Sequence, residues 1–487
     1  MGDPADEFRN QWVNPRDILS LLLLVGGDIV QKAIAQLVGF RLRPFSRGRG
    51  RGISIAPVAF SFGWVAYGFT NLLAAVGDMS LMPRNEHPSI LVTCSNGFVR
   101  ENRSWVLGRF LRDHELKYVA DRDKNDEHQT PVSVRIDIFH LEPGSDVTCD
   151  YVWWCGWATL VVQLAIAAIP WGLYGDWSAM LVTLCGTLLV LGTCMIPQWE
   201  REKWAGRKLR GDKTMCLTRG NGSAHIIVLL GSAGSWDIES AAAASDTPHR
   251  HPGTRVIAMV LALLWTFLLL SVAGLQDNTW FLVAIGALGM VQNVLAAGAP
   301  RHPSASGLHL RSFERAPTII GRRESYVDDT DASVDLDRTN AELASLAAWA
   351  SQPPLRHSSD SHKPAAASTM PPMPAWLQTM SSEDGVPSWL EAKQPSSQGK
   401  TIEEGGDVVY ATGVHGALME LEKWVPTAGL AMVQVFFPGG LEYNDASIRD
   451  NVHKKFWQRA YYTAPVRKRA EARRKVEENR GRDTEPC

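Results

Sequence analysis

Long apolar runs dominate the pattern of the first 300 residues. A transmembrane helix needs about 20 mostly apolar residues, because each residue advances the helix by about 1.5 Å. Tryptophans stand at the ends of several runs, where aromatic belts lie in membrane proteins. Four runs meet the required length without a charged residue, at 151–173, 177–197, 256–275 and 279–299. They predict four membrane spans.

Two further segments near the N-terminus are candidate spans. Residues 53–77 carry no charge, whereas the second half of 15–39 carries Asp28 and Lys32. At about 100° per residue these two side chains share one face of a helix, and side chains four apart can form an ion pair. We expect 15–39 to be a sixth span whose polar face looks into the bundle. A helix lying in the membrane interface is the alternative.

The links between the spans predict a topology. Very short links join the four long runs into two antiparallel hairpins. With six spans, the N-terminus (1–14), the long loops 78–150 and 198–255 and the C-terminal tail share one side of the membrane. Lys and Arg near span ends favour the cytosolic side. In this chain basic residues occur on both sides of the predicted bundle, so the two sides give conflicting signals. The loop 41–52 holds five Arg on the opposite side, but the shared side holds more basic residues. We therefore expect the shared side to be cytosolic.

The two long loops carry patterns of strands and helices. Residues 89–94 and 131–141 predict strands, the second by alternating apolar and polar positions. Residues 100–118 predict a helix, and 215–231 predict two strands joined by a tight turn. Together these segments predict a small mixed α/β element beneath the helix bundle.

The glycines of 215–231 raise the alternative of a phosphate-binding loop. Asn221-Gly222 between two apolar runs is a strong hairpin signal, because both residues tolerate a positive φ. A Walker loop requires a Lys-Ser/Thr pair, and a dinucleotide fingerprint requires a third glycine that opens a helix. Neither follows Gly222. The stretch predicts a turn.

The last third of the chain differs in composition. Residues 300–405 are rich in Ser, Pro and Ala, which predicts a disordered linker. Two short similar pieces within it, around Trp376 and Trp389, are candidate docking segments for protein partners, with chance similarity as the alternative. Order is expected again over 406–443, which is too short to span and should pack on the soluble part or the membrane surface. The tail, 444–487, is basic. Contact with anionic lipid is one interpretation, and a solvated charged helix is the alternative. No nucleic-acid recognition fold accompanies it, so no nucleic acid is expected as a partner.

Composition and short motifs do not indicate a catalytic or metal-binding site. The net charge of -2 gives no general attraction to nucleic acid. The seven cysteines are scattered, without a CxxC pair or a Cys/His cluster at zinc spacing. Neither GxSxG, HExxH nor a kinase motif set occurs. We expect no catalytic residues, metal or cofactor, and a protein that is not an enzyme.

Polar side chains inside the apolar runs are the candidate functional residues. An ionisable side chain at mid-membrane costs at least ~2.5 kcal/mol on insertion scales, and so suggests a function. Asp28 with Lys32 is the strongest candidate, because a transporter can use a carboxylate as its ion or proton site; a structural ion pair is the alternative. Hydrogen bonds between helices are the simpler explanation for the amides, which are Asn71, Gln163, Gln292 and Asn293.

Several segments together resemble a group of uncharacterised multi-pass integral membrane proteins of filamentous fungi. The likeness covers roughly 10–310 and 413–443. The resemblance implies an architecture and carries over no activity or functional residue. The segments are NPRDILSLLLLVGGDIVQKAIAQLVG, PVAFSFGWVAYGF, ENRSWVLGRFLRD, LTRGNGSAHIIVLLG, NTWFLVAIGALGMVQNVLAAGAPR and VFFPGGL.

Three classes of function stay open. The expected fold is an α-helical membrane bundle of about six spans with a small α/β element and a long disordered C-terminal region. A large soluble face beside sparsely polar spans favours a membrane scaffold or regulatory protein. A transporter or channel with Asp28 as its charged centre is the alternative. A membrane enzyme ranks third, because no nucleophile–base set is present.

Overall fold

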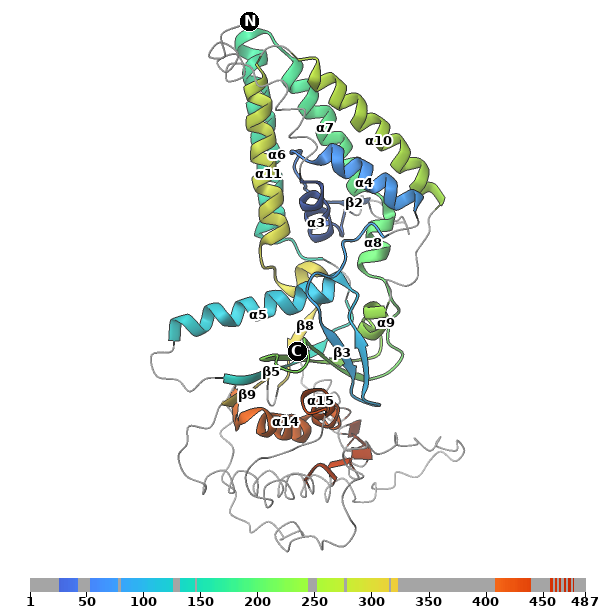
Figure 1. Ribbon diagram of the computed structural model, residues 1–487, viewed down its shortest axis with the longest axis vertical. Helices are drawn as coiled ribbons and strands as arrows, with labels where there is room; N and C mark the ends of the chain where they lie inside the picture. Colours follow the sequence, from blue (N-terminus) through green and yellow to red (C-terminus); the bar gives the residue numbers. More distant parts are fainter. Residues whose placement is uncertain are drawn as a thin grey trace, which may run out of the picture.

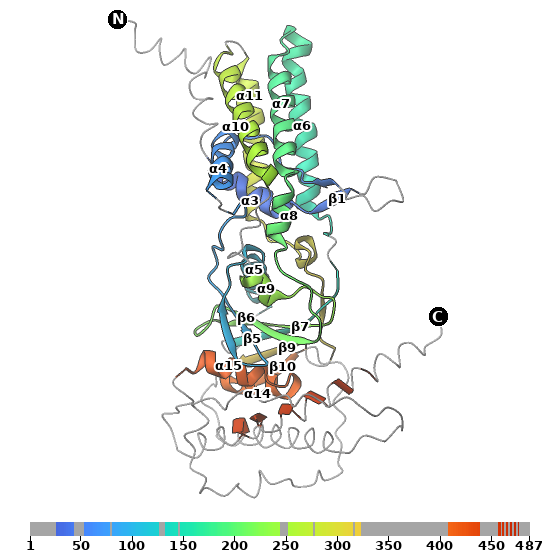
Figure 2. The ribbon, with the colours of Figure 1, turned by 90° about the vertical axis from the view of Figure 1, so that its right-hand side faces the viewer.

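A computed structural model describes most of the chain in four stacked layers, seen in Figure 1 and edge-on in Figure 2. From top to bottom these are apolar helices, short connecting helices, a mixed β-sheet and two C-terminal helices. The described residues are 26–42, 53–77, 80–125, 132–144, 147–243, 252–275, 278–314, 317–322 and 408–438, with short pieces between 456 and 476.

The upper layer holds two antiparallel hairpins and two shorter helices. The tips of the hairpins meet, since Asn278 Nδ2 donates to Asp176 Oδ2 at 2.9 Å. In the described part of the chain, three helices (α6, α10 and α11) are long and apolar enough to cross a membrane. A fourth span is present if α7 and α8, which are separated by a bend of 46°, are counted together as one span. The helices are α3 (Gly27–Leu37), α4 (Trp64–Val76), α6 (Tyr151–Tyr174), α7 (Ser178–Cys194), its continuation α8 (Pro197–Lys203), α10 (Pro252–Ala273) and α11 (Thr279–Gly298).

Of the two N-terminal candidate spans, 53–77 does not form one helix, and residues 15–25 of the other lie outside the described residues. Residues 53–77 divide into a short strand, an extended stretch at 56–62 and α4, which has only 13 residues. Pro57 lacks a backbone N–H, and Gly63 precedes α4 with a left-handed φ of 85°. The described part of 15–39 is α3, whose 11 residues are too short to cross a bilayer. The predicted bundle of six full-length spans is therefore not what the described residues form.

A short hairpin at the base of the bundle corrects the predicted topology. Strands β1 (Phe40–Leu42) and β2 (Ile53–Ile55) pair antiparallel, and they flank the basic loop. Arg41 forms an ion pair with Glu200 of α8. The start of the basic loop therefore lies on the same side as the segment that follows α7, whereas the sequence predicted opposite sides.

The sheet has eight strands among the described residues, in the order β10-β9-β5-β7-β6-β3-β4, with β8 also paired to β5. The pairs β5–β7 and β9–β10 are parallel, and the other pairs are antiparallel. The strands predicted at 89–94 and 131–141 and the hairpin of 215–231 are present. The strands are β3 (Ile90–Thr93), β4 (Phe98–Glu101), β5 (Val132–Leu141), β6 (Lys213–Thr218), β7 (His225–Gly231), β8 (Leu310–Ser312), β9 (Thr318–Arg322) and β10 (Val408–Thr412).

The sheet is larger than the predicted element because it recruits segments from 300–405. Strands β8 and β9 lie inside that range, which was predicted to be disordered; residues 323–405 lie outside the described residues. A short 3-10 helix, η2 (Pro303–Ser306), precedes β8. Both strands are brief and pair with β5, a partner far away in the sequence. Local pattern alone does not reveal such pairing.

Helices cover both faces of the sheet. The predicted helix at 100–118 is present as α5 (Trp105–Asn125), which lies between the bundle and the sheet (Figure 1), and α9 (Ile238–Ala243) packs on β3 and β4. On the far face lie α14 (Gly413–Trp424) and α15 (Ala428–Phe436). The described residues 408–438 thus pack on the soluble part, which is one of the two placements predicted for 406–443; residues 439–443 lie outside the described residues.

The described pieces of the C-terminal tail also lie on this far face. Phe456 and Trp457 are fully buried there, and Trp457 Nε1 donates to Nε2 of His415 at 2.8 Å. These aromatic residues are part of a core on the side of the sheet away from the apolar helices (Figure 2). Contact between the basic tail and lipid stays a prediction.

Candidate functional site

An extended segment, residues 56–62, runs through the interior of the helix bundle. Ala56, Val58, Ala59 and Ser61 in this segment are fully buried. Within the segment the N–H of Val58 donates to the carbonyl of Ala56 at 2.9 Å. A chain outside helix and sheet nevertheless leaves most of its backbone N–H and C=O groups without partners of its own, and a bilayer core offers no water to replace them. The segment therefore needs hydrogen bonds from the surrounding helices.

Gln163 of α6 supplies the first of these bonds. Its Nε2 donates to the carbonyl of Phe60 at 2.6 Å and to the carbonyl of Ile285 in α11 at 2.9 Å. One amide thus joins three elements, α6, the segment and α11. The side chain is fully buried, so this bond stands in place of a bond to water.

Two neighbouring amides of α11 support the other side of the segment. Gln292 Oε1 accepts from the N–H of Ala59 at 3.2 Å, and Asn293 Nδ2 donates to Ser61 Oγ at 2.6 Å. The indole N–H of Trp64 donates to the carbonyl of Ala59 at 3.1 Å. Three of the six predicted site residues, Gln163, Gln292 and Asn293, therefore meet at one place.

Glycines let the helices approach this segment closely. A Cβ at Gly156 of α6 would clash with the carbonyl oxygen of Pro57, and one at Gly289 of α11 would clash with that of Phe60. A Cβ at Gly286 would strike the ring of Phe62. Because the obstacles are backbone atoms or packed rings, the bundle closes around the segment only with glycine at these positions.

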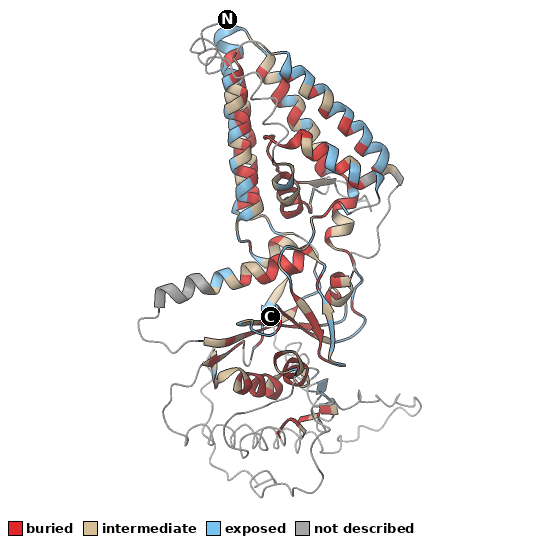
Figure 3. Ribbon diagram, in the orientation of Figure 1, coloured by how far each residue is buried: buried red, intermediate tan, exposed pale blue. Residues whose placement is uncertain are grey.

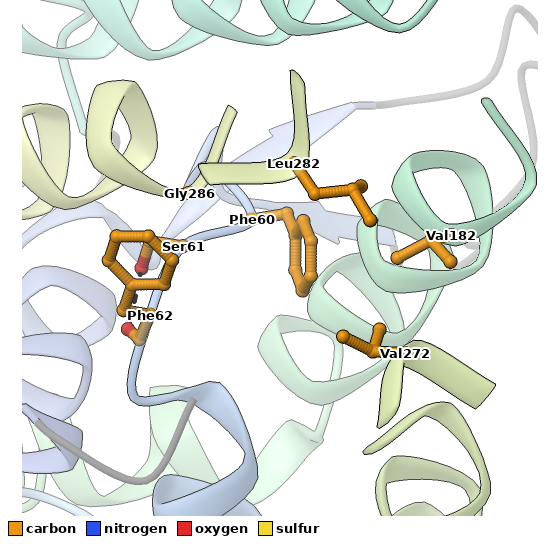
Figure 4. A pocket seen from close by; sticks show the side chains of 7 residues that line it. All are labelled: Phe60, Ser61, Phe62, Val182, Val272, Leu282 and Gly286. Atoms are coloured by element: carbon orange, nitrogen blue, oxygen red, sulfur yellow. Dashed lines mark hydrogen bonds between the residues drawn. The ribbon is translucent and has the colours of Figure 1, made fainter. Parts of the chain in front are cut away.

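A small apolar pocket adjoins the segment, between it and the hairpins (Figure 4). Its volume is about 10 Å³, which is room for about one water molecule. In this conformation it is too small for a solute larger than water. Its lining consists of Phe60, Ser61, Phe62, Val182, Val272, Leu282 and Gly286.

Gln163, Gln292 and Asn293, called the amide cluster here, bind the segment through uncharged hydrogen-bonding groups. Among the described residues, the side chains bonded to the segment are amides, a hydroxyl and an indole. Gln163 Oε1 and Asn293 Oδ1 are buried without a described partner, so each can accept one more bond. None of these groups carries charge, which suits support of the backbone or contact with a small neutral polar group.

The other three predicted residues lie elsewhere. Asp28 is 72% exposed on α3 at the base of the bundle, so the expectation that its face looks into the bundle is wrong. Lys32 contacts Asp28 at 3.9 Å but pairs more closely with Glu86, at 2.6 Å. Asn71 is buried on α4, and its Oδ1 has no partner among the described residues.

A buried charged junction, which no local pattern marked as a site, lies where the bundle meets α5, since the N–H of Arg301 donates to Asp113 of α5 at 3.1 Å. Arg301 follows α11 and donates from Nε and Nη2 to both carboxylate oxygens of Asp150, at 2.5 and 2.8 Å. Asp150 is also the N-cap of α6, accepting from the N–H of Trp153. Burial alone would raise the pKa of Asp150, but the hydrogen bond and charge of Arg301 hold that pKa below its usual value.

Cations of this junction also cover the C-terminal ends of two helices. Lys203 donates to the carbonyl of Val38 at the end of α3, and Arg112 donates to that of Gly298 at the end of α11, at 2.7 and 2.8 Å. Arg109 donates to Ala299 at 3.2 Å. Positive charge at a helix C-terminus offsets the helix dipole and satisfies free carbonyls. The only signal in the sequence is that these basic residues lie near the ends of apolar runs.

A second buried charged cluster fastens α5 to the sheet. Asp137 of β5 is 1% exposed, and its carboxylate bonds to His114 Nε2 and Arg135 Nε, both at 2.9 Å. The hydroxyl of Thr318 donates to its other oxygen at 2.7 Å. The guanidinium of Arg135 also lies over the ring of Tyr118, 3.4 Å from its centre. These contacts stay inside the cluster, which indicates a structural role.

Comparison with known proteins does not identify the chain. No family model matches it, and neither a curated protein nor a solved structure is significantly similar. The resemblance to fungal membrane proteins stays a prediction, and function must be inferred from the geometry above.

Proposed function

We propose that this protein is a membrane-embedded scaffold or regulatory protein that is not an enzyme, and that it holds its α/β domain at one face of a bilayer. The observation that carries the proposal is the contrast between the two ends of the molecule. Large apolar side chains on the outer faces of the apolar helices are exposed (Figure 3), while at the sheet-side end of α11 the carbonyls of Gly298 and Ala299 accept hydrogen bonds from Arg112 and Arg109 of α5.

The exposed side chains support insertion into lipid. On α10 the residues Leu263, Phe267 and Leu270 are 60%, 62% and 63% exposed. A soluble monomer rarely exposes such a continuous apolar surface. Trp154 near one end of α6 and Trp171 near the other are also exposed, as expected for side chains at the two interfaces of a bilayer.

The proposed topology has four crossing helices, α6, α7, α10 and α11. The shorter α3 and α4, and the segment between them in sequence, enter the bundle from the sheet side. In this topology α3 and α4 do not form two further membrane crossings. The sheet lies in the cytosol in this proposal. A rigid link between spans and sheet suits a protein whose soluble surface recruits or regulates partners.

Two measurements on the full chain test the proposal. Membranes from an expressing eukaryotic cell are washed with alkaline carbonate, and the purified protein is reconstituted into liposomes for proton and alkali-cation flux. We expect the protein to stay in the carbonate-washed membranes and the flux to equal that of protein-free liposomes. Release by carbonate would refute membrane insertion, and flux through the liposomes would refute the scaffold role.

Transport is the second candidate, favoured by the extended segment itself. Interrupted helices with non-helical backbone at membrane depth are typical of transporter binding sites. In that case the amide cluster, rather than Asp28, would contact the solute. Flux that Gln163→Leu removes and Asp28→Asn leaves intact would support this alternative.

A further inference from the structure

Two cysteines from distant parts of the chain meet on the far face of the sheet. Cys216 lies in β6 and is paired in register with Val92 of β3, while Cys94 follows β3 directly. The N–H of Cys94 donates to the carbonyl of Thr214 at 3.0 Å. Residues 94 and 216 therefore point to the same face of the sheet, and their Sγ atoms are 3.4 Å apart.

The pair is enclosed by the lower core. Cys94 is 3% exposed and Cys216 is fully buried, in the hydrophobic cluster that α14 and α15 cover. The hydrogen bond with Cys94, together with burial, raises the pKa of the Cys216 thiol well above its usual value. At neutral pH Cys216 is therefore a thiol, and it must lose its proton before its sulfur can attack a disulfide.

We propose that Cys94 and Cys216 are a redox pair that closes to an intrachain disulfide when a low-molecular-weight disulfide such as oxidised glutathione is present. The sulfur of Cys94 attacks one sulfur of the oxidant and gives up its proton to the sulfur that leaves, forming a mixed disulfide and releasing one thiol. Cys216 loses its proton and attacks Cys94 Sγ, releasing the second thiol. Two protein thiols are oxidised, and one external disulfide is reduced to two thiols. This proposal stands independently of the proposed function.

Closing the bond requires a small movement, and the surroundings indicate which residue moves. A disulfide has an S–S distance of about 2.05 Å, so the two sulfurs must approach by more than about 1 Å from their present 3.4 Å. Cys216 is held between β3 and β7, whereas Cys94 begins the turn 94–97. That turn lies against Gln434 of α15 at Gly97. Oxidation therefore shifts the turn on which α15 rests.

The test is a redox titration of the full chain in detergent. Samples are equilibrated with defined ratios of reduced and oxidised glutathione, quenched in acid, unfolded and alkylated, and each cysteine is then quantified by peptide mass spectrometry. We expect Cys94 and Cys216 to lose alkylation together, with one midpoint, and their linked peptide to show the loss of two hydrogens. Cys149, Cys155 and Cys185, which are half-buried, should not pair.

Matched variants make the result specific. In Cys94→Ser, Cys216 should no longer form the linked peptide, while Cys149→Ser should leave the Cys94–Cys216 midpoint unchanged. A parallel series with diamide, a small neutral oxidant, removes dependence on access of glutathione to a buried site. Alkylation of both cysteines at every ratio with both oxidants would overturn the proposal, and so would a disulfide to any other cysteine.

Discussion

At the scale of single residues, Asp137 shows how one buried charge holds two layers together. Asp137→Asn removes the negative charge that His114 and Arg135 share. Breaking a buried ion pair by removing one partner costs about 3–5 kcal/mol, and the remaining amide recovers part of this. We expect the free energy of unfolding to fall by roughly 3 kcal/mol, measured by denaturant titration in detergent. Glu101→Gln, at an exposed position of β4, is the control, and an equal loss there would contradict the argument.

His225 predicts how stability responds to mild acid. Burial lowers the pKa of His225 below its usual value, and its Nδ1 has no described partner. The unfolded chain therefore takes up a proton near pH 6.5, before the folded chain does. The sign follows directly: this group favours the unfolded state as the pH falls below about 6.5.

The measurement is the unfolding midpoint between neutral and mildly acidic pH. We expect the midpoint of the wild type to fall as the pH drops, and the slope to be smaller in His225→Gln. Identical slopes in the wild type and His225→Gln would show that His225 does not contribute.

At the scale of elements, the extended segment 56–62 depends on how closely α6 approaches it. Gly156 and Gly172 lie in the same helix, but an added Cβ clashes with the Pro57 carbonyl at Gly156 and meets nothing within 4 Å at Gly172. Overpacking typically costs about 1–3 kcal/mol, whereas Gly→Ala in a helix gains up to about 1 kcal/mol. Gly156→Ala should lower the thermal unfolding midpoint, and Gly172→Ala should leave it unchanged or raise it.

The charged junction predicts a second contrast between variants. Arg301→Gln leaves the carboxylate of Asp150 and the carbonyl of Gln36 without their buried cation, which should cost about 3–5 kcal/mol. Arg311 forms exposed pairs with Glu142 and Glu314, so Arg311→Gln should cost no more than about 1 kcal/mol. Denaturant titration of both proteins checks this. Similar losses would mean that the junction does not join the bundle to α5.

The elements that were predictable from sequence are those specified by neighbouring residues. The apolar runs of α6, α10 and α11 and the Asn221-Gly222 turn carry their signals locally, and all are present. The segment 56–62 was predicted as helix because its apolar composition is the same in either conformation. Its partners Gln163 and Gln292 stand 103 and 233 residues away from the groups they bond. The sequence alone identified these amides as polar residues within apolar runs, but it did not identify the segment 56–62 to which they bond.

At the scale of the whole molecule, one described contact bears on the conflict between basic segments. Two full spans before residue 77 would place the loop 41–52 opposite the segment after α7. Arg41, at the start of that loop, instead donates to Glu200 of α8 at 3.1 Å. Among the described residues, Arg41, Lys203 and Arg301 thus all lie at the sheet-side ends of the helices. Basic segments favour the cytosolic side, so the sheet is expected to face the cytosol.

Glycosylation provides the test of this orientation, and the structure shows which site reports it. The sequence holds two N-glycosylation sequons, which begin at Asn102 and Asn221. Asn221 is exposed in the turn between β6 and β7. Asn102 is 3% exposed, and its Nδ2 donates to Ser89 Oγ at 2.9 Å. A glycan on Asn102 is incompatible with this fold. We expect no endoglycosidase shift in the wild type, and loss of a C-terminal tag when protease is added outside sealed microsomes whose cytosolic face is outward. A shift that Asn221→Gln abolishes, together with a protected tag, would place the sheet in the lumen. In that compartment the Cys94–Cys216 pair should be isolated as a persistent disulfide.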